Sequence, residues 1–266
     1  MHPDRLSAAS PHPPPTVLKR QPHLARIPAA SWQAIERLFS HLGWFGVFLL
    51  LAPFLGPRDY GLFILAAGGI AILESLFGEV AAQTLLRQPQ IDERHASTLF
   101  VTTAGCAAAV SLVLCGLARA AASMLDADVL SDMFQSLALL PMLGALLAVP
   151  RALLLRRGRT APFAAAATVG TAAGGAVAIT LAVAGAGAWS LVAQLIVHRF
   201  FEIAILWSVG ARGVGLRWSR RHFGELAAAL DIAALAPALR SAARHVPCLI
   251  AGVALGPVAA GLYLVG

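Results

Sequence analysis

Residues 55–65 read L-G-P-R-D-Y-G-L-F-I-L, and residues 255–265 read L-G-P-V-A-A-G-L-Y-L-V. The L-G-P start and the later G-L pair recur at a constant offset of 200 residues, and an aromatic residue follows each G-L pair. A long-period repeat in an apolar chain is typical of transporters built from two related halves. Because the sequence ends soon after the second copy begins, we expect one half and the first helix of another.

The composition excludes an ordinary soluble domain. Hydrophobic residues make up 58% of the chain, charged residues only 12%, and the mean hydropathy is +0.75. The sequence pI of 10.6 would suit a nucleic-acid partner. We expect none, because the basic residues of membrane proteins gather in cytoplasmic loops. The sequence has no phosphate-binding loop, no G-x-S-x-G, no H-E-x-x-H and no C-x-x-C, so we do not expect an enzyme.

Apolar segments separated by polar or Gly- and Pro-containing turns predict an all-α membrane protein with about seven transmembrane helices. The predicted spans cover residues 32–55, 61–86, 97–121, 129–155, 161–184, 189–210 and 226–255. Residues 1–30 are rich in proline and predict a disordered cytoplasmic tail. The remaining chain divides into a six-helix lobe, residues 31–215, and a linker with the first helix of a truncated second lobe, residues 216–266.

Two patterns inside the spans predict how the helices are shaped and packed. Pro141 and Pro150 interrupt the fourth span, and proline removes a helical hydrogen bond. Gly170 and Gly174 form a G-x-x-x-G pair in the fifth span. This spacing lets helices approach closely, and we expect packing within one bundle in preference to a dimer contact.

The distribution of Lys and Arg predicts the orientation. The tail and the alternate loops after the second, fourth and sixth spans hold 15 basic residues, whereas the other side holds Arg58 and Arg119. Cytoplasmic loops carry the excess of basic residues, so we expect a cytoplasmic N-terminus.

Polar and ionisable residues inside the spans predict the functional site. Such residues are costly in a membrane and usually face a bundle interior or a hydrated cavity. They occur in the second, sixth and seventh predicted spans: Glu74, Gln194, His198, Arg199, Glu202, Asp231, Arg240 and Arg244. We therefore expect these three helices to share a cleft, with Glu74 as a partner of Arg199 or Arg240.

Two interpretations of these residues remain open. The first is that they form internal ion pairs; Gln194, His198 and Glu202 lie four residues apart on one helix face, and Arg199 is three residues from Glu202. The second is that they handle a charged cargo. Arg199, Arg240, Arg244, His198 and Gln194 are then candidates for substrate binding, because guanidinium groups pair with phosphate. Glu74, Glu202 and Asp231 are candidates for binding a coupling ion.

No metal site or cofactor is predicted. His95 and His222 fall in expected loops, where we predict solvated side chains in preference to ligands.

Five segments together carry a resemblance to a known family. They are F-L-G-P-R-D-Y-G-L-F at 54–63, T-L-L-R-Q-P-Q-I-D-E-R-H at 84–95, V-P-R-A-L-L-L-R-R at 149–157, G-A-W-S-L-V-A-Q at 187–194 and A-L-G-P-V-A-A-G-L-Y at 254–263. With these segments, residues 32–266 resemble the bacterial polysaccharide flippases of the multidrug/oligosaccharidyl-lipid/polysaccharide exporter superfamily. The first and last segments are the most specific. Pro247 departs from the polar or acidic residue that such proteins often have there.

The resemblance implies two helical lobes around a central cavity and a mechanism of alternating access. It implies a multi-pass protein of the bacterial inner membrane that transports an undecaprenyl-pyrophosphate-linked oligosaccharide for exopolysaccharide or O-antigen synthesis, with a polymerase and glycosyltransferases as pathway partners. Two alternatives remain open at this point. One is a cation-coupled multidrug antiporter of the same superfamily, and the other is a non-transporting membrane subunit of a polysaccharide-assembly complex.

Overall fold

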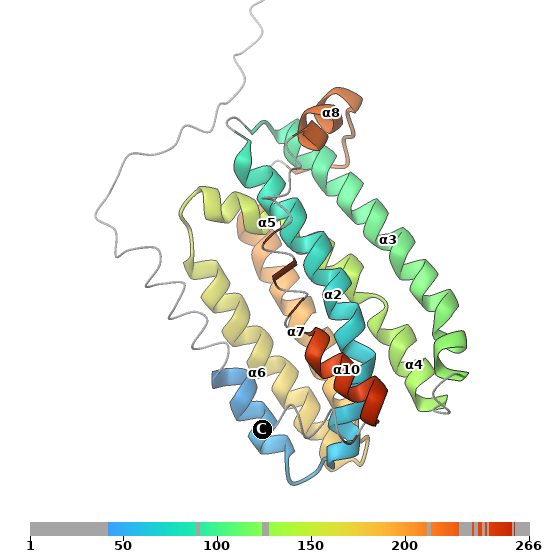
Figure 1. The fold of residues 1–266 in the computed structure, drawn as a ribbon. Helices are drawn as coiled ribbons and strands as arrows, with labels where there is room; N and C mark the ends of the chain where they lie inside the picture. Colours follow the sequence, from blue (N-terminus) through green and yellow to red (C-terminus); the bar gives the residue numbers. More distant parts are fainter. Residues whose placement is uncertain are drawn as a thin grey trace, which may run out of the picture.

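The computed structural model describes residues 42–88, 91–123, 128–211 and 214–228, and then 236, 239–240, 243, 245–256 and 258. Within these residues the chain is all-helical (Figure 1). A short apolar helix, Leu42–Leu51, comes first. The elements that follow are α2 (Pro57–Arg87), α3 (Glu93–Ser123), α4 (Asp128–Leu137), α5 (Leu140–Arg156), α6 (Ala161–Val183), α7 (Trp189–Gly210), α8 (Arg220–Ala228) and α10 (Val246–Leu255).

Five described helical segments are long and apolar enough to cross a membrane. They are Pro57–Arg87, Glu93–Leu117, Ser131–Arg156, Ala161–Val183 and Trp189–Gly210. These match the second to sixth predicted spans, which confirms the all-α membrane class. Large apolar side chains such as Phe45, Leu112 and Phe200 are exposed on the outside, as a lipid-facing surface requires. The protein is therefore a multi-pass membrane protein.

The L-G-P segment forms the turn between the first helix and α2. The first helix ends at Leu51, four residues before the predicted end at residue 55, because residues 52–54 form a turn. Pro57 then starts α2, where its missing N–H costs no helical hydrogen bond. The Gly56 N–H donates to Asp59 Oδ2 at 3.0 Å and satisfies a donor at the helix start.

The fourth predicted span is a broken helix, and its two prolines act differently. The chain turns at Ala138 and Leu139 between α4 and α5, and Pro141 lies in the first turn of α5. Pro150 instead lies within α5, which continues to Arg156. A proline at this position leaves the Leu146 carbonyl without its helical donor. The Trp207 indole N–H of α7 donates to that carbonyl at 2.9 Å, so α7 supplies the missing bond.

The central helix of the bundle is α5. It packs against α2, α3 and α7, and its buried face includes Leu147, Val149 and Leu154 (Figure 1). The other extensive contact joins α6 to α7. A Cβ added at Gly174 would lie 2.6 Å from the Gln194 carbonyl oxygen of α7, so only glycine fits there. The prediction that the G-x-x-x-G pair packs within the bundle is therefore confirmed.

Two labelled helices, α8 and α10, overlap the predicted seventh span, residues 226–255. The first, α8, begins at Arg220, six residues before the predicted start and inside the expected basic loop, so that boundary is wrong. Packing against the start of α3 explains the difference, since tertiary contacts stabilise a short polar helix. The second, α10, packs against α2, where Leu249 lies close to Gly68 (Figure 1). The predicted tail, residues 1–30, lies outside the described residues.

Candidate functional site

A cluster of four charged side chains joins three helices inside the bundle. Arg199 of α7 contacts Glu74 of α2, with 2.7 Å between Nε and Oε1, and Glu202 of α7, with 2.6 Å between Nη1 and Oε2. Arg151 of α5 contacts the other oxygen of Glu202 at 3.1 Å. The carboxylates are 11% and 7% exposed and Arg199 is 23% exposed. We call these four residues the inner cluster.

Glycines of the neighbouring helices make room for this cluster. A Cβ at Gly144 of α5 would lie 2.5 Å from Cγ of Glu74, and a Cβ at Gly170 of α6 would lie 2.8 Å from Nδ1 of His198. Larger residues would displace these polar side chains from the interface. The small residues thus let α5 and α6 approach the polar faces of α2 and α7.

The polar stripe of α7 extends beyond the ion pairs. His198 Nε2 lies 4.0 Å from Glu202, and the Trp44 ring lies against the imidazole with 5.5 Å between ring centroids. Gln194 is buried one turn before His198 in α7. His198 Nδ1 is buried and has no hydrogen-bond partner among the described residues. The stripe is therefore part of the protein interior and does not face lipid.

The inner cluster is balanced, with two guanidinium groups and two carboxylates. Charge is tolerated inside a membrane protein when it is paired, and removal of one partner leaves an uncompensated charge. Arg199 is held by two carboxylates, so an anionic ligand would have to replace one of them. Arg151 is 44% exposed and is the accessible end of the cluster. The arrangement is therefore a set of internal ion pairs with one partly accessible guanidinium group.

The structure brings together five of the sequence-predicted residues: Glu74, Gln194, His198, Arg199 and Glu202. The predicted pairing of Glu74 with Arg199 is confirmed. Arg240 is exposed, and no ion pair within the described part of the chain includes it. Asp231 and Arg244 lie outside the described residues. The roles of all eight residues in binding substrate or a coupling ion stay predictions.

Arg151 is the member of the cluster that sequence reasoning missed. It falls within the fourth predicted span, residues 129–155, yet it was counted with the basic residues on the cytoplasmic side and not as a residue of the helix interior; it lies inside α5, which continues to Arg156. The apolar run A-L-L-L that follows Arg151 was the available signal, because it places Arg151 a full turn before the end of that span. Its partner Glu202 could not be identified from spacing, since the two residues lie 51 positions apart.

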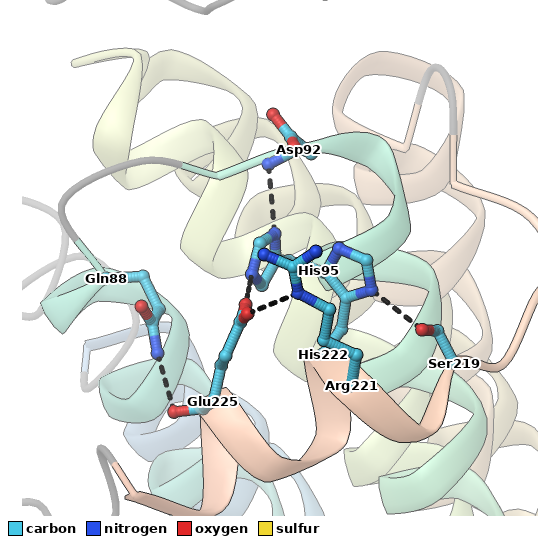
Figure 2. A network of polar contacts seen from close by, with 7 residues as sticks. All are labelled: Gln88, Asp92, His95, Ser219, Arg221, His222 and Glu225. Carbon is cyan, nitrogen blue, oxygen red and sulfur yellow. Dashed lines mark hydrogen bonds and ion pairs between the residues drawn. The ribbon is translucent and has the colours of Figure 1, made fainter.

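A second polar network lies at one end of the bundle, where α8 packs against the start of α3 (Figure 2). His95 Nε2 lies 2.8 Å from Glu225 Oε2, and Arg221 Nε donates to Glu225 Oε1 at 3.1 Å. Gln88 donates from Nε2 to the Glu225 carbonyl oxygen at 3.2 Å. The hydrogen bonds from His95 and Arg221 hold the pKa of the Glu225 carboxyl below its usual range.

His222 and Asp92 complete this network. The His222 Nδ1 lies 2.8 Å from Ser219 Oγ, and its ring meets the His95 ring edge-on with 4.3 Å between centroids (Figure 2). Asp92 donates its backbone N–H to His95 Nδ1 at 3.4 Å. The prediction that His95 and His222 lie in loops is wrong, because His95 belongs to α3 and His222 to α8. We call Asp92, His95, His222 and Glu225 the rim cluster.

A cavity of about 330 Å³ lies beside the rim cluster. It is lined by Glu93, Arg94, Ser97, Val214, Gly215 and Arg217. The Gly215 N–H donates to Ser97 Oγ at 2.9 Å and holds the chain that leads into α8 against α3. The cavity therefore lies where α3 meets the segment after α7, as the rim cluster does.

The fold and the inner cluster define a multi-pass helical membrane protein with paired charges in its interior. A family model described as a polysaccharide biosynthesis protein matches residues 50–266. The chain belongs to this family, and the resemblance carried by the L-G-P segments is confirmed. Neither a curated protein nor a solved structure matches the chain. Membership indicates a part in polysaccharide biosynthesis or export.

Proposed function

We propose that the chain takes part in moving a lipid-linked oligosaccharide across the bacterial inner membrane during exopolysaccharide or O-antigen synthesis. The observation that carries this proposal is the inner cluster, in which paired charges connect α2, α5 and α7 within a bundle of apolar helices. Membership of a polysaccharide biosynthesis family supports a cargo from that chemistry. The proposal assigns no bond-making step to the chain and treats it as a transport protein in preference to an enzyme.

The mechanism exchanges partners within the inner cluster. Arg199 is neutralised by Glu74 and Glu202, so its guanidinium group is available to a pyrophosphate only when a carboxylate releases it. Protonation of a carboxylate, or cation binding to it, would allow this release. Anion binding and ion coupling would therefore be linked, because both compete for the same ion pairs. Alternating access between two lobes would carry the cargo across.

Complementation tests the transport role. The full chain, with Arg199→Lys and Arg199→Gln variants, is expressed in a strain that lacks its own copy of this gene. We expect surface polysaccharide with the unchanged chain, reduced export with Arg199→Lys, which keeps the charge but not the planar fork, and none with Arg199→Gln. Membrane levels of each variant are measured in parallel. Full export by a well-inserted Arg199→Gln chain would contradict the proposal, as would unchanged export in the deletion strain.

The same proposal places the turn around residues 157–160 in the cytoplasm. Cys106, Cys115 and Cys248 are first replaced by serine. Single cysteines are then introduced at Gly158 and Ala186, which lie in turns at opposite ends of α6. A membrane-impermeant thiol reagent added to intact spheroplasts should label Ala186→Cys and spare Gly158→Cys. The reverse pattern would overturn the orientation.

A further inference from the structure

We propose that Asp92, His95 and His222 form a binding site for one divalent transition-metal ion, with the preference of a zinc site. The ion would fasten α8 to the turn between α2 and α3. This inference is independent of the transport proposal, because it concerns residues outside the inner cluster. It also differs from the sequence-based prediction of solvated histidines.

The three residues are close enough to share an ion. One ligand atom from each lies within 4.8 Å of the others. Ligands about 2.0–2.1 Å from a tetrahedral zinc ion lie roughly 3.4 Å from one another. Closing the difference requires a movement of about an ångström, which we expect rotation of the three side chains to supply. Two imidazoles and one carboxylate suit zinc, cobalt or nickel better than calcium or magnesium, which prefer oxygen ligands.

Both histidines already have a partner on their second ring nitrogen. His95 directs Nε2 to Glu225 Oε2 at 2.8 Å, and His222 directs Nδ1 to Ser219 Oγ at 2.8 Å (Figure 2). Such outer partners fix the tautomer and the ring orientation of metal-binding histidines. They leave His95 Nδ1 and His222 Nε2 as the ligand atoms.

The tautomer of His95 agrees with this assignment. The Asp92 N–H donates to His95 Nδ1, so Nδ1 carries a lone pair and Nε2 carries the proton that faces Glu225. The bond from Asp92 is long, at 3.4 Å, and an ion would replace it at little cost. The His95 side chain is only 12% exposed, which orders its ring before the ion arrives.

The position of the site gives it a structural role. Asp92 and His95 belong to the first predicted lobe, whereas His222 follows the predicted boundary at residues 215–216. Residues 95 and 225 are 130 positions apart and already in contact. A bound ion would therefore strengthen the attachment of the linker to the first lobe, and its release would loosen it.

Metal titration of the full chain tests the site. The protein is purified in detergent without a polyhistidine tag, stripped with EDTA and titrated with Co²⁺ and then Zn²⁺. We expect one Co²⁺ per chain, with the visible absorption of a four-coordinate ion, displaced by Zn²⁺ in the micromolar range. Hydrogen exchange in α8 should slow at least several-fold when Zn²⁺ binds.

Variants separate this site from adventitious binding. His222→Gln and Asp92→Asn should abolish the Co²⁺ absorption, and Glu225→Gln should weaken binding about 10–100-fold through its contact with His95. The matched control changes His2, His12 and His23 to alanine and should bind as the unchanged chain does. The proposal is overturned if no ion binds, or if the first two variants, shown to be folded by circular dichroism, bind Co²⁺ normally.

Discussion

Glu202 and Glu225 both lie among arginine and histidine side chains, Glu202 with two arginines and His198 at 4.0 Å and Glu225 with one arginine and His95, yet their surroundings differ. Glu202 pairs with Arg199 and Arg151 inside the bundle and is 7% exposed. Glu225 pairs with Arg221 and His95 at the rim and is 42% exposed. Inside the bundle a lost partner leaves a charge that water compensates only in part, whereas at the rim water replaces the partner. Burial, more than the choice of partner, should decide which network stabilises the protein.

The largest difference is expected from neutralising each carboxylate. Glu202→Gln leaves Arg151 unpaired and Arg199 with Glu74 only, and should destabilise the fold by about 3–5 kcal/mol. Glu225→Gln should not move the thermal unfolding midpoint measurably. Both midpoints are measured by differential scanning fluorimetry of the purified chain in the same detergent.

Restoring the charge balance distinguishes electrostatics from packing. Adding Arg151→Gln to Glu202→Gln leaves one carboxylate, Glu74, facing one guanidinium group, Arg199. The double variant should recover part of the lost stability. If it unfolds no later than Glu202→Gln alone, charge balance does not hold the inner cluster together.

A smaller effect is expected from filling the space beside each network. Gly144→Ala brings a Cβ within 2.5 Å of Glu74 Cγ and should cost about 1–3 kcal/mol by displacing the carboxylate from Arg199. Gly224 lies next to Glu225 in α8. The Cβ of a Gly224→Ala variant would meet nothing within 4 Å apart from its chain neighbours and the backbone of its own helix. This variant should be neutral or slightly stabilising, because alanine favours a helix more than glycine does. Equal losses of unfolding temperature in both variants would show that close packing is not specific to the inner cluster.

Sequence patterns predicted the long membrane-spanning helices better than the short helix α8. Spans two to six follow from apolar length and from turn residues such as Gly56 and Pro57, because these are local properties. The break near Pro141 was also predicted, whereas Pro150 was expected to interrupt a helix that continues. The donor that compensates for it, Trp207, lies 61 positions from Leu146 and gives no local signal. Helix α8 was missed for the same reason, since contacts with α3 stabilise it.

The inner cluster was partly predictable because depth within a span can be estimated from sequence. Glu74 and Arg199 lie near the middle of their spans, and the cost of burying them indicated a partner. Arg151 lies near a helix end, where an arginine usually reaches water, so depth gave no indication of its contact with Glu202. No sequence pattern indicated the rim cluster either, because the cluster depends on how α8 folds back toward His95.

The smallest expected effect concerns the pH dependence of the rim. The pKa of Glu225 is lowered in the folded chain by His95 and Arg221, so the contribution of this carboxylate is present above its unfolded pKa of about 4.3. It is lost as the pH falls through the lowered value. Hydrogen exchange in α8 should therefore accelerate several-fold between about pH 6 and pH 3, after correction for the intrinsic rate.

Two variants show whether Glu225 causes this change. Glu225→Gln should give α8 fast exchange throughout the pH range, because the amide cannot carry the charge that His95 and Arg221 recognise. Glu93→Gln, in the first turn of α3, removes an exposed carboxylate nearby and should keep the profile of the unchanged chain. An identical pH profile in Glu225→Gln and the unchanged chain would mean that another carboxylate attaches α8. The inner cluster serves as the internal reference, since α7 should exchange slowly across the same range while Arg199 and Arg151 hold Glu202.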